Sequence, residues 1–190
     1  NWDSWEFFGD SYDGEHACLH ISNNFTCRDL DSGTTLFNLG ASVDEVHRMA
    51  DGRLLLWAGW SSASAWVLDP QTWSVTLLSD RISNTHFGGL LANGDIWGWR
   101  PTPDNAYYDR QLVHLRRDGS ARVGDFPVNL QRRNDFIKWR LGKIIEATSI
   151  QQFRIDADDD LVYWVRSQLT PSIKTIVIRM PWNNMIWQEL

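Results

Sequence analysis

The sequence predicts an all-β fold in which one four-stranded antiparallel unit is repeated four times. Asp-Gly or Asn-Gly pairs, the strongest short signals for a β-hairpin, stand at positions 13–14, 51–52 and 93–94, and Asp159-Asp160 takes the same place late in the chain. An apolar or aromatic run follows each pair. The first residues of the pairs are 38, 42 and 66 positions apart. A period of about 40–50 residues with four short strands is typical of the blades of a β-propeller.

These repeats divide the chain into four blades, at about residues 1–40, 41–80, 81–126 and 151–190. We expect a four-bladed propeller, either closed on itself or part of a larger ring. Segment 127–150 interrupts the strand pattern. Its apolar residues Phe136, Trp139 and Leu141 have helical spacing, which predicts a helical insertion, and its basic residues form a face that is either solvated or docks a partner.

The predicted strands are apolar on both faces, as in Leu54-Leu55-Leu56-Trp57. Sheets that are covered on both sides require this pattern. The 12 tryptophans agree with it, because large aromatic side chains can fill the space between neighbouring blades.

One segment resembles a known repeat family. Val67 to Leu78, reading VLDPQTWSVTLL, resembles the end of a kelch-type blade, as in galactose-oxidase-like propellers, where a Tyr/Val-x-Asp-Pro-x-Thr-x-x-Trp pattern joins the outer two strands. The tryptophan stands one place early, at Trp73, and the diglycine of such blades occurs at Gly88-Gly89. The resemblance implies a propeller fold, and it does not point to any active-site residue in this chain.

A second segment, Asp29 to Phe37, partly resembles the Asp-box of sialidase-like propellers. Asp31, Gly33 and Thr35 match the motif, whereas Asp29 and Leu36 replace its serine and tryptophan. This resemblance too implies only the fold class.

Composition excludes two classes of partner. The net charge of −6 over 190 residues argues against nucleic-acid binding, which depends on Lys and Arg that neutralise phosphates. No apolar run approaches the roughly 20 residues of a membrane-spanning helix. Because the chain begins at Asn1 rather than Met, we expect a leader or a longer precursor.

Cys18 and Cys27 are the two cysteines. If Ile21 to Asn24 closes a two-residue hairpin, facing residues have numbers that sum to 45, so the cysteines face each other at a non-hydrogen-bonded position where a disulfide can form. Asn24-Phe25-Thr26 is an N-glycosylation sequon in the same hairpin. Two buried free thiols and a chance sequon are the alternative. Together the two signals favour a secreted glycoprotein.

A loop at Arg100 to Arg110 is the best candidate for ligand binding, since it is long and rich in proline, and loops carry function more often than strands do. Its candidate binding residues are Arg100, Asp104, Tyr107 and Tyr108. The alternative is that both tyrosines begin the next strand.

Asp156, Asp158 and Asp160 have the Asp-x-Asp-x-Asp spacing of a calcium-binding loop, although the glycine and the distal glutamate of such loops are missing. The same segment aligns with the hairpin turns of the other blades. It is therefore either a turn or a Ca²⁺ site.

No nucleophile elbow, zinc-binding His pair, phosphate loop or dinucleotide fingerprint occurs in the sequence, so no cofactor other than Ca²⁺ is expected and catalysis has no support. The sequence favours a non-catalytic module that binds a protein or a glycan through loops at one mouth of the propeller. One alternative is a structural subunit of an extracellular assembly, in which self-association or another chain completes the ring. A second alternative is a carbohydrate-active propeller enzyme.

Overall fold

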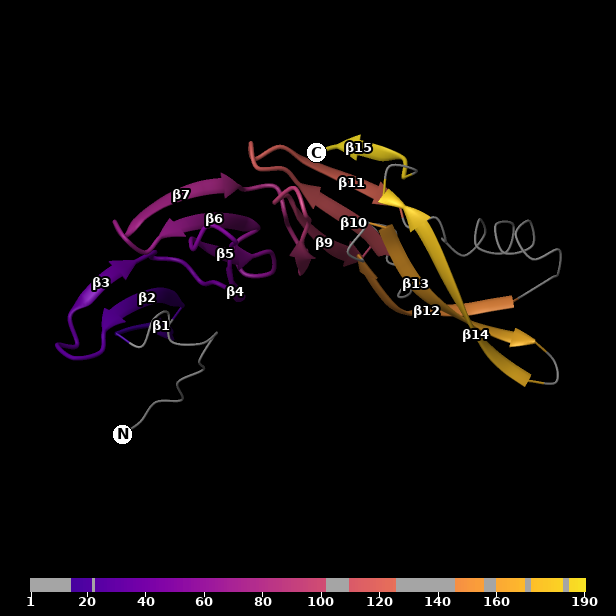
Figure 1. The fold of residues 1–190 in the computed structure, drawn as a ribbon, viewed down its shortest axis with the longest axis horizontal. Coiled ribbons are helices and arrows are strands. Elements are labelled where there is room, and N and C mark those ends of the chain that lie inside the picture. Colours follow the sequence, from indigo (N-terminus) through magenta and orange to yellow (C-terminus); the bar gives the residue numbers. More distant parts are fainter. Residues whose placement is uncertain are drawn as a thin grey trace. The chain divides into compact units, whose positions relative to one another are not determined.

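The computed structural model describes residues 15–21, 23–101, 110–125, 146–155, 160–169, 172–182 and 185–190. All the regular elements in these ranges are β-strands (Figure 1). The strand pairs whose registers are given below are antiparallel. The predicted all-β fold class is confirmed. The chain divides into two compact units, residues 1–87 and 88–190. Within the described part of the chain, no helix is long and apolar enough to cross a membrane.

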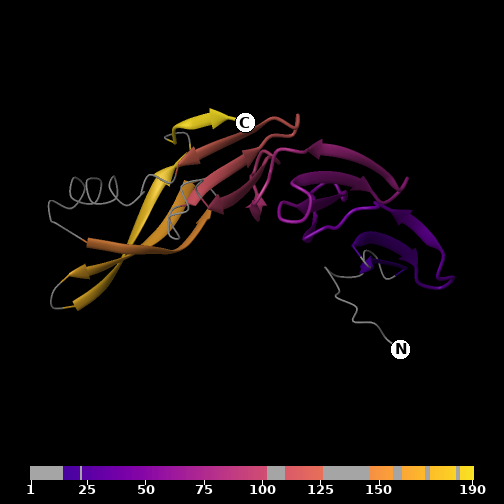
Figure 2. The same ribbon diagram turned by 180° about the vertical axis from the view of Figure 1, so that it is seen from behind.

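The first unit contains two sheets, each a meander in which consecutive strands are neighbours (Figure 2). The first sheet is formed by β1 (His16–Ile21), β2 (Asn24–Asp29) and β3 (Thr35–Asn38). The second is formed by β4 (Glu45–Arg48), β5 (Leu54–Ala58), β6 (Ser64–Asp69) and β7 (Ser74–Ser79).

The other two sheets follow in the chain. The third is formed by β8 (His86–Leu90), β9 (Ile96–Pro101), β10 (Arg110–Leu115) and β11 (Ala121–Asp125), with β15 (Trp187–Glu189) added beside β11. β8 spans the boundary between the two units. The fourth sheet is formed by β12 (Glu146–Ile155), β13 (Asp160–Leu169) and β14 (Ser172–Pro181).

The Asp51-Gly52 pair turns the chain between β4 and β5, as the sequence predicted. Met49 N donates to Arg53 O at 2.8 Å and Gly52 N donates to Met49 O at 3.0 Å, which closes a three-residue loop. Only Gly52 has a positive φ, of 86°. A type I turn followed by one left-handed residue has this geometry, so one glycine suffices. Asn93-Gly94 and Asp118-Gly119 form the same hydrogen-bonded loop.

The predicted helical insertion is wrong where the structure can test it. Residues 127–145 lie outside the described part of the chain, but Glu146 to Ile150 belong to β12. β12 pairs with β13 from Glu146↔Gln168 to Ile155↔Leu161, with two register irregularities. β12 therefore satisfies its backbone by cross-strand pairing, and the residues whose helical spacing predicted the insertion, Phe136, Trp139 and Leu141, lie outside the described part of the chain.

The expectation of four strands in every blade is also corrected. In the described residues the sheets have three, four, five and three strands, and the segment expected to complete the last blade pairs with β11 instead. The register is Arg122↔Glu189, Val123↔Gln188 and Gly124↔Trp187. Gly124 lets β15 lie this close to β11, because a Cβ at position 124 would lie only 3.1 Å from the Trp187 ring. Residues 1–14, at the start of the expected first blade, lie outside the described part.

The core of the first unit lies between its two sheets. β2 and β3 contribute Phe25, Cys27 and Phe37, and the second sheet contributes Leu54, Leu56 and Leu68. All five residues of β5 are buried, which accounts for its continuous apolar run. One face of β5 packs in this cluster, and Trp57 on the opposite face contacts Phe87.

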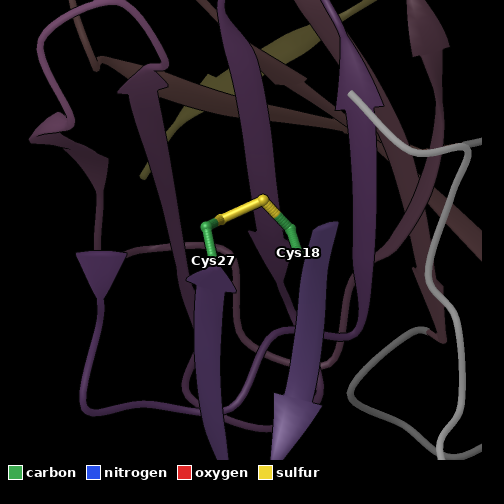
Figure 3. Close-up of a disulfide and its surroundings, with 2 residues drawn as sticks. All are labelled: Cys18 and Cys27. Carbon is green, nitrogen blue, oxygen red and sulfur yellow. A yellow bond between two sulfur atoms is a disulfide. The ribbon is translucent and has the colours of Figure 1, made fainter. Parts of the chain in front are cut away.

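The β1–β2 hairpin has the predicted register, with every pair from His16↔Asp29 to Ile21↔Asn24. Cys18 and Cys27 face each other across it, with Cα atoms 3.9 Å apart, and form a disulfide between the two strands (Figure 3). The predicted disulfide is confirmed, and it ties the half-buried side chain of Cys18 to a cysteine in the core cluster.

Candidate functional site

The candidate site lies at one end of the two sheets of the first unit. β4 runs away from this end and β5 returns to it, so the β5–β6 connection, residues 59–63, lies beside the residue that precedes β4, Asp44. The β1–β2 hairpin belongs to the same end, because Ser42 Oγ donates to Asn23 O at 3.3 Å. We call this set of connections the loop face.

Trp60 projects from the loop face and is 52% exposed. Its backbone N–H donates to Asp44 Oδ2 at 2.7 Å, and Ser61 N donates to the same oxygen at 3.3 Å. The indole Nε1 donates to His86 Nδ1 at 3.1 Å, with the two rings 4.8 Å apart and 71° from parallel. Both the backbone and the ring of Trp60 are therefore held in place while about half of its surface stays open to a ligand.

Serine side chains connect the loops around Trp60. Ser61 Oγ donates to Ser42 O at 3.2 Å, and Ser42 in turn contacts Asn23. Ser61, Ser62 and Asn23 are exposed. The loop face thus combines one large aromatic ring with a row of small hydroxyl and amide groups, which is a combination of apolar and polar surface that suits ligand binding.

Buried aromatic residues support the loop face from behind. The Trp57 indole, 1% exposed, donates to Thr85 O at 2.9 Å, one residue before His86. Phe87 stacks on His47 with centroids 3.6 Å apart and meets Trp57 edge to face at 5.7 Å. Gly59 is required here, because any Cβ at this position would collide with the Thr85 carbonyl. The segment that carries His86 is fixed by these contacts.

The binding residues predicted from the sequence stay predictions, because the structure describes only Arg100 among them. Arg100 lies near the end of β9, where its Nε donates to Gln111 Oε1 on β10 at 3.2 Å and partial burial lowers the pKa of its guanidinium. Asp104, Tyr107 and Tyr108 lie outside the described residues. Their loop joins the second and third strands of its meander, as the Trp60 loop does in the second sheet.

Two other candidate sites stay predictions. Asp156 and Asp158 of the proposed Ca²⁺ loop lie outside the described part, and Asp160 is the first residue of β13. Among the residues that are described, no three His, Cys, Asp or Glu side chains form a group that could hold a metal ion. Asn24 of the sequon is half-buried at the start of β2.

A hollow of about 220 Å³ lies at the opposite end of the second sheet, between its two hairpin turns. Asp51 and Arg53 in its wall form an ion pair at 2.7 Å, and Asp69 Oδ1 accepts from Gln71 N at 2.8 Å. The charged groups of this hollow therefore already have partners, and it is a weaker candidate than the loop face.

The second unit contains a buried polar network centred on His114, which is 4% exposed. Its Nε2–H donates to Asp95 Oδ2 at 2.9 Å, and its Nδ1 accepts from Arg122 Nε at 2.8 Å. Arg122 also lies 4.5 Å from the centre of the Trp187 ring. Because both nitrogens of this neutral imidazole are engaged, His114 on β10 is placed to join β11 and the β8–β9 turn rather than to transfer protons.

Burial lowers the pKa of His114, and the positive charges of Arg122 and Arg116 act in the same direction, while the hydrogen bond to Asp95 opposes them. The folded chain therefore binds fewer protons at this site than the unfolded chain does. The stability that His114 contributes is complete above its ordinary pKa of 6.5 and is lost as the pH falls below that value.

We expect the urea-unfolding midpoint to fall between pH 7.5 and pH 5 more steeply in the native chain than in a His114→Gln variant, which keeps one donor and one acceptor but does not titrate. Parallel pH profiles of the two proteins would contradict this assignment. The measurement is chemical unfolding at a series of pH values.

Sequence reasoning missed Trp60, Asp44 and His86. Most tryptophans in the predicted strands are packing residues, and Trp60 is surrounded by the small residues Gly59 and Ser61 that indicated only a turn. A tryptophan in a turn was the signal that could have found it. Its partners lie 16 and 26 positions away in the chain, which no local pattern indicates.

No family model matches this chain, and no curated protein matches it. Solved structures similar to it include selenomethionine-substituted virginiamycin B lyase from Staphylococcus aureus, with 12% identity over 95% of this chain and 82% of that chain and a TM-score of 0.37. A catalytically inactive form of the lyase with quinupristin has a TM-score of 0.35. The tricorn protease has 9% identity, a TM-score of 0.43 and 27% of its chain covered. None of these similarities assigns a function to this chain.

Proposed function

We propose that this protein is a non-catalytic recognition domain that binds a glycan on its loop face, with a sugar ring stacked on Trp60. The observation that carries the proposal is a tryptophan that is 52% exposed and yet held by hydrogen bonds from both its backbone and its indole nitrogen. A ring held in this way loses little conformational freedom when a ligand binds, so more of the contact energy appears as affinity.

The surroundings of Trp60 support a sugar as the ligand. The C–H face of a pyranose is apolar and packs against an aromatic face, while its hydroxyl groups need polar partners at the rim. Ser61 and Ser62 are exposed beside Trp60, and Asn23 is exposed on the same loop face. The Asp44 carboxylate and the net charge of −6 favour a neutral glycan over a sulfated or carboxylated one.

Binding is better supported than catalysis at this site. His86 Nδ1 accepts the indole N–H, and Asp44 Oδ2 accepts two backbone N–H groups, so both side chains hold the loop. The disulfide supports an oxidising compartment, and with the Asn24 sequon we propose a secreted glycoprotein. The meander order of the sheets supports blades of a kelch-like propeller.

The test is a Trp60→Ala variant. We expect a glycan array of neutral oligosaccharides to identify a ligand, and calorimetry to show that the variant binds it about 30-fold more weakly or worse, as for aromatic residues that become buried when a ligand binds. Trp60→Phe should keep part of the affinity, since it keeps an aromatic face but loses the bond to His86.

Leu30→Ala is the matched control, because Leu30 is also 52% exposed but lies in the β2–β3 turn. It should bind as the native chain does. Full affinity in Trp60→Ala, or no glycan bound by the native chain at millimolar concentrations, would refute the proposal.

A further inference from the structure

β15 is a short strand at the outer edge of the third sheet, where it lies beside β11 (Figure 1). It pairs with β11 over only three residues, 187–189. Two of these, Gln188 and Glu189, are exposed, and Ile186 just before the strand is 81% exposed. Because so short a strand buries little surface of its own, its attachment depends on the few side chains that anchor it.

Two side chains anchor β15. The Glu189 carboxylate accepts hydrogen bonds from both terminal nitrogens of Arg116, at 2.8 and 3.1 Å, but this ion pair is largely open to solvent and such pairs contribute little. The second anchor is Trp187, whose ring centre lies 4.5 Å from the Arg122 guanidinium and 5.6 Å from the His114 ring. The buried indole nitrogen of Trp187 has no hydrogen-bond partner among the described residues, so its ring is held by packing.

The observed position of Arg122 requires a neutral His114. A guanidinium donates hydrogen bonds and cannot accept them, so the 2.8 Å contact from Arg122 Nε requires a bare lone pair on His114 Nδ1. The other nitrogen, Nε2, donates to Asp95 at 2.9 Å. An added proton therefore binds at Nδ1, where it meets the Arg122 N–H and places two positive charges within hydrogen-bond distance.

The charged groups that face His114 in the described part of the chain have opposite effects on it. Burial, and after it the positive charges of Arg122 on β11 and of Arg116 after β10, lower the pKa of His114. Asp95 in the β8–β9 turn raises it. On β15 the carboxylate of Glu189 is already paired with Arg116. The neighbours of His114 on β9 and after β14 are uncharged aromatic rings.

We propose that β15 is a pH-sensitive strap, which stays closed on β11 while His114 is neutral and is released when His114 binds a proton. The proton displaces Arg122 and so removes the guanidinium that packs on Trp187. Departure of Trp187 uncovers one side of the His114 ring, so the imidazolium reaches water. The open state therefore binds a proton more readily than the closed state does, and a fall in pH favours opening.

The release is local, because β15 carries little of the packing of the third sheet. The β10 residues Leu112, Val113 and Leu115 are fully buried, whereas none of the three β15 residues is buried. Local opening costs least where few apolar contacts hold an element. We therefore expect β15 to leave β11 at a pH at which β8 to β11 are still paired.

The test is amide hydrogen exchange of the full chain, read by mass spectrometry at pH 7.5 and pH 5.0 and corrected for the effect of pH on unstructured amides. The peptide that contains β15 should lose protection about tenfold between the two pH values, since a difference of one pKa unit between the open and closed states is a factor of ten. Peptides from β9 and from the first unit should keep their protection.

Three variants test the mechanism. His114→Gln keeps a donor and an acceptor but does not titrate, so its β15 should be equally protected at both pH values. Arg122→Gln replaces the guanidinium by an amide that can donate to a bare Nδ1 or accept from a protonated one, and it should abolish most of the pH dependence. Arg116→Gln is the matched control. It removes a nearby charge and the pair with Glu189, but Arg116 acts on His114 only through its charge, so the pH dependence should persist.

Equal protection of β15 at the two pH values in the native chain would overturn the proposal. A pH dependence that Arg122→Gln leaves unchanged would overturn it too, as would a loss of protection in every peptide at once, which is global unfolding. Circular dichroism identifies a variant that does not fold, and if His114→Gln is such a variant, the two arginine variants still decide. Glycan binding by Trp60 is measured separately, so neither proposal depends on the outcome of the other.

Discussion

Replacing Trp57 by alanine is expected to lower the free energy of unfolding of the first unit by about 3–5 kcal/mol. Trp57 is 1% exposed and is among the largest fully buried side chains of the described residues. Its removal leaves a cavity beside Phe87 and deprives the Thr85 carbonyl of its indole donor. Urea unfolding followed by circular dichroism measures the loss.

The matched control is the same substitution at Trp60, which is 52% exposed and should cost less than about 1 kcal/mol. Trp57→Phe should lie between the two, because it fills most of the cavity but cannot donate to Thr85 O. Trp57→Ala should also weaken ligand binding, since Thr85 precedes the histidine that orients the Trp60 ring. Equal stability losses at positions 57 and 60 would contradict the packing described above.

Asp95→Ala is expected to cost the second unit about 3 kcal/mol. The Asp95 carboxylate accepts from His114 Nε2 at 2.9 Å, from Arg117 N at 3.2 Å and from Asn93 Nδ2 at 2.9 Å. Hydrogen bonds to a charged group contribute about 1.5–3 kcal/mol each, and the imidazole N–H of His114 would be left buried without its partner. Thermal or urea unfolding of the variant gives the cost.

Asp118→Ala tests whether this cost is specific to burial. Asp118 also stabilises a hairpin turn, through Ser120 N at 2.9 Å, but it is exposed and should cost less than about 1 kcal/mol. Asp95→Asn should recover part of the loss, because an amide oxygen still accepts one hydrogen bond. If Asp95→Ala and Asp118→Ala were equally mild, the network around His114 would contribute little to stability.

Local chemistry in the sequence determined a large part of the fold. Turn pairs such as Asp51-Gly52 and Asn93-Gly94 locate hairpins because glycine adopts the left-handed conformation that their loops require. The β1–β2 register, and with it the Cys18–Cys27 disulfide, followed from the position of one turn, since pairing on either side of a hairpin is set by its loop. The apolar run of β5 predicted a strand that is buried on both faces.

Tertiary structure alone decided the rest, because those features depend on partners far away in the chain. Glu146 to Ile150, which the sequence placed in a helical insertion, form a strand that pairs with β13. β15 pairs with β11 instead of completing the expected last blade. There the Glu189 carboxylate accepts a hydrogen bond of 2.8 Å from Arg116, which lies 73 positions earlier in the chain. Trp60 becomes a binding candidate only through Asp44 and His86, which fix an exposed ring that local pattern could not distinguish from a packing residue.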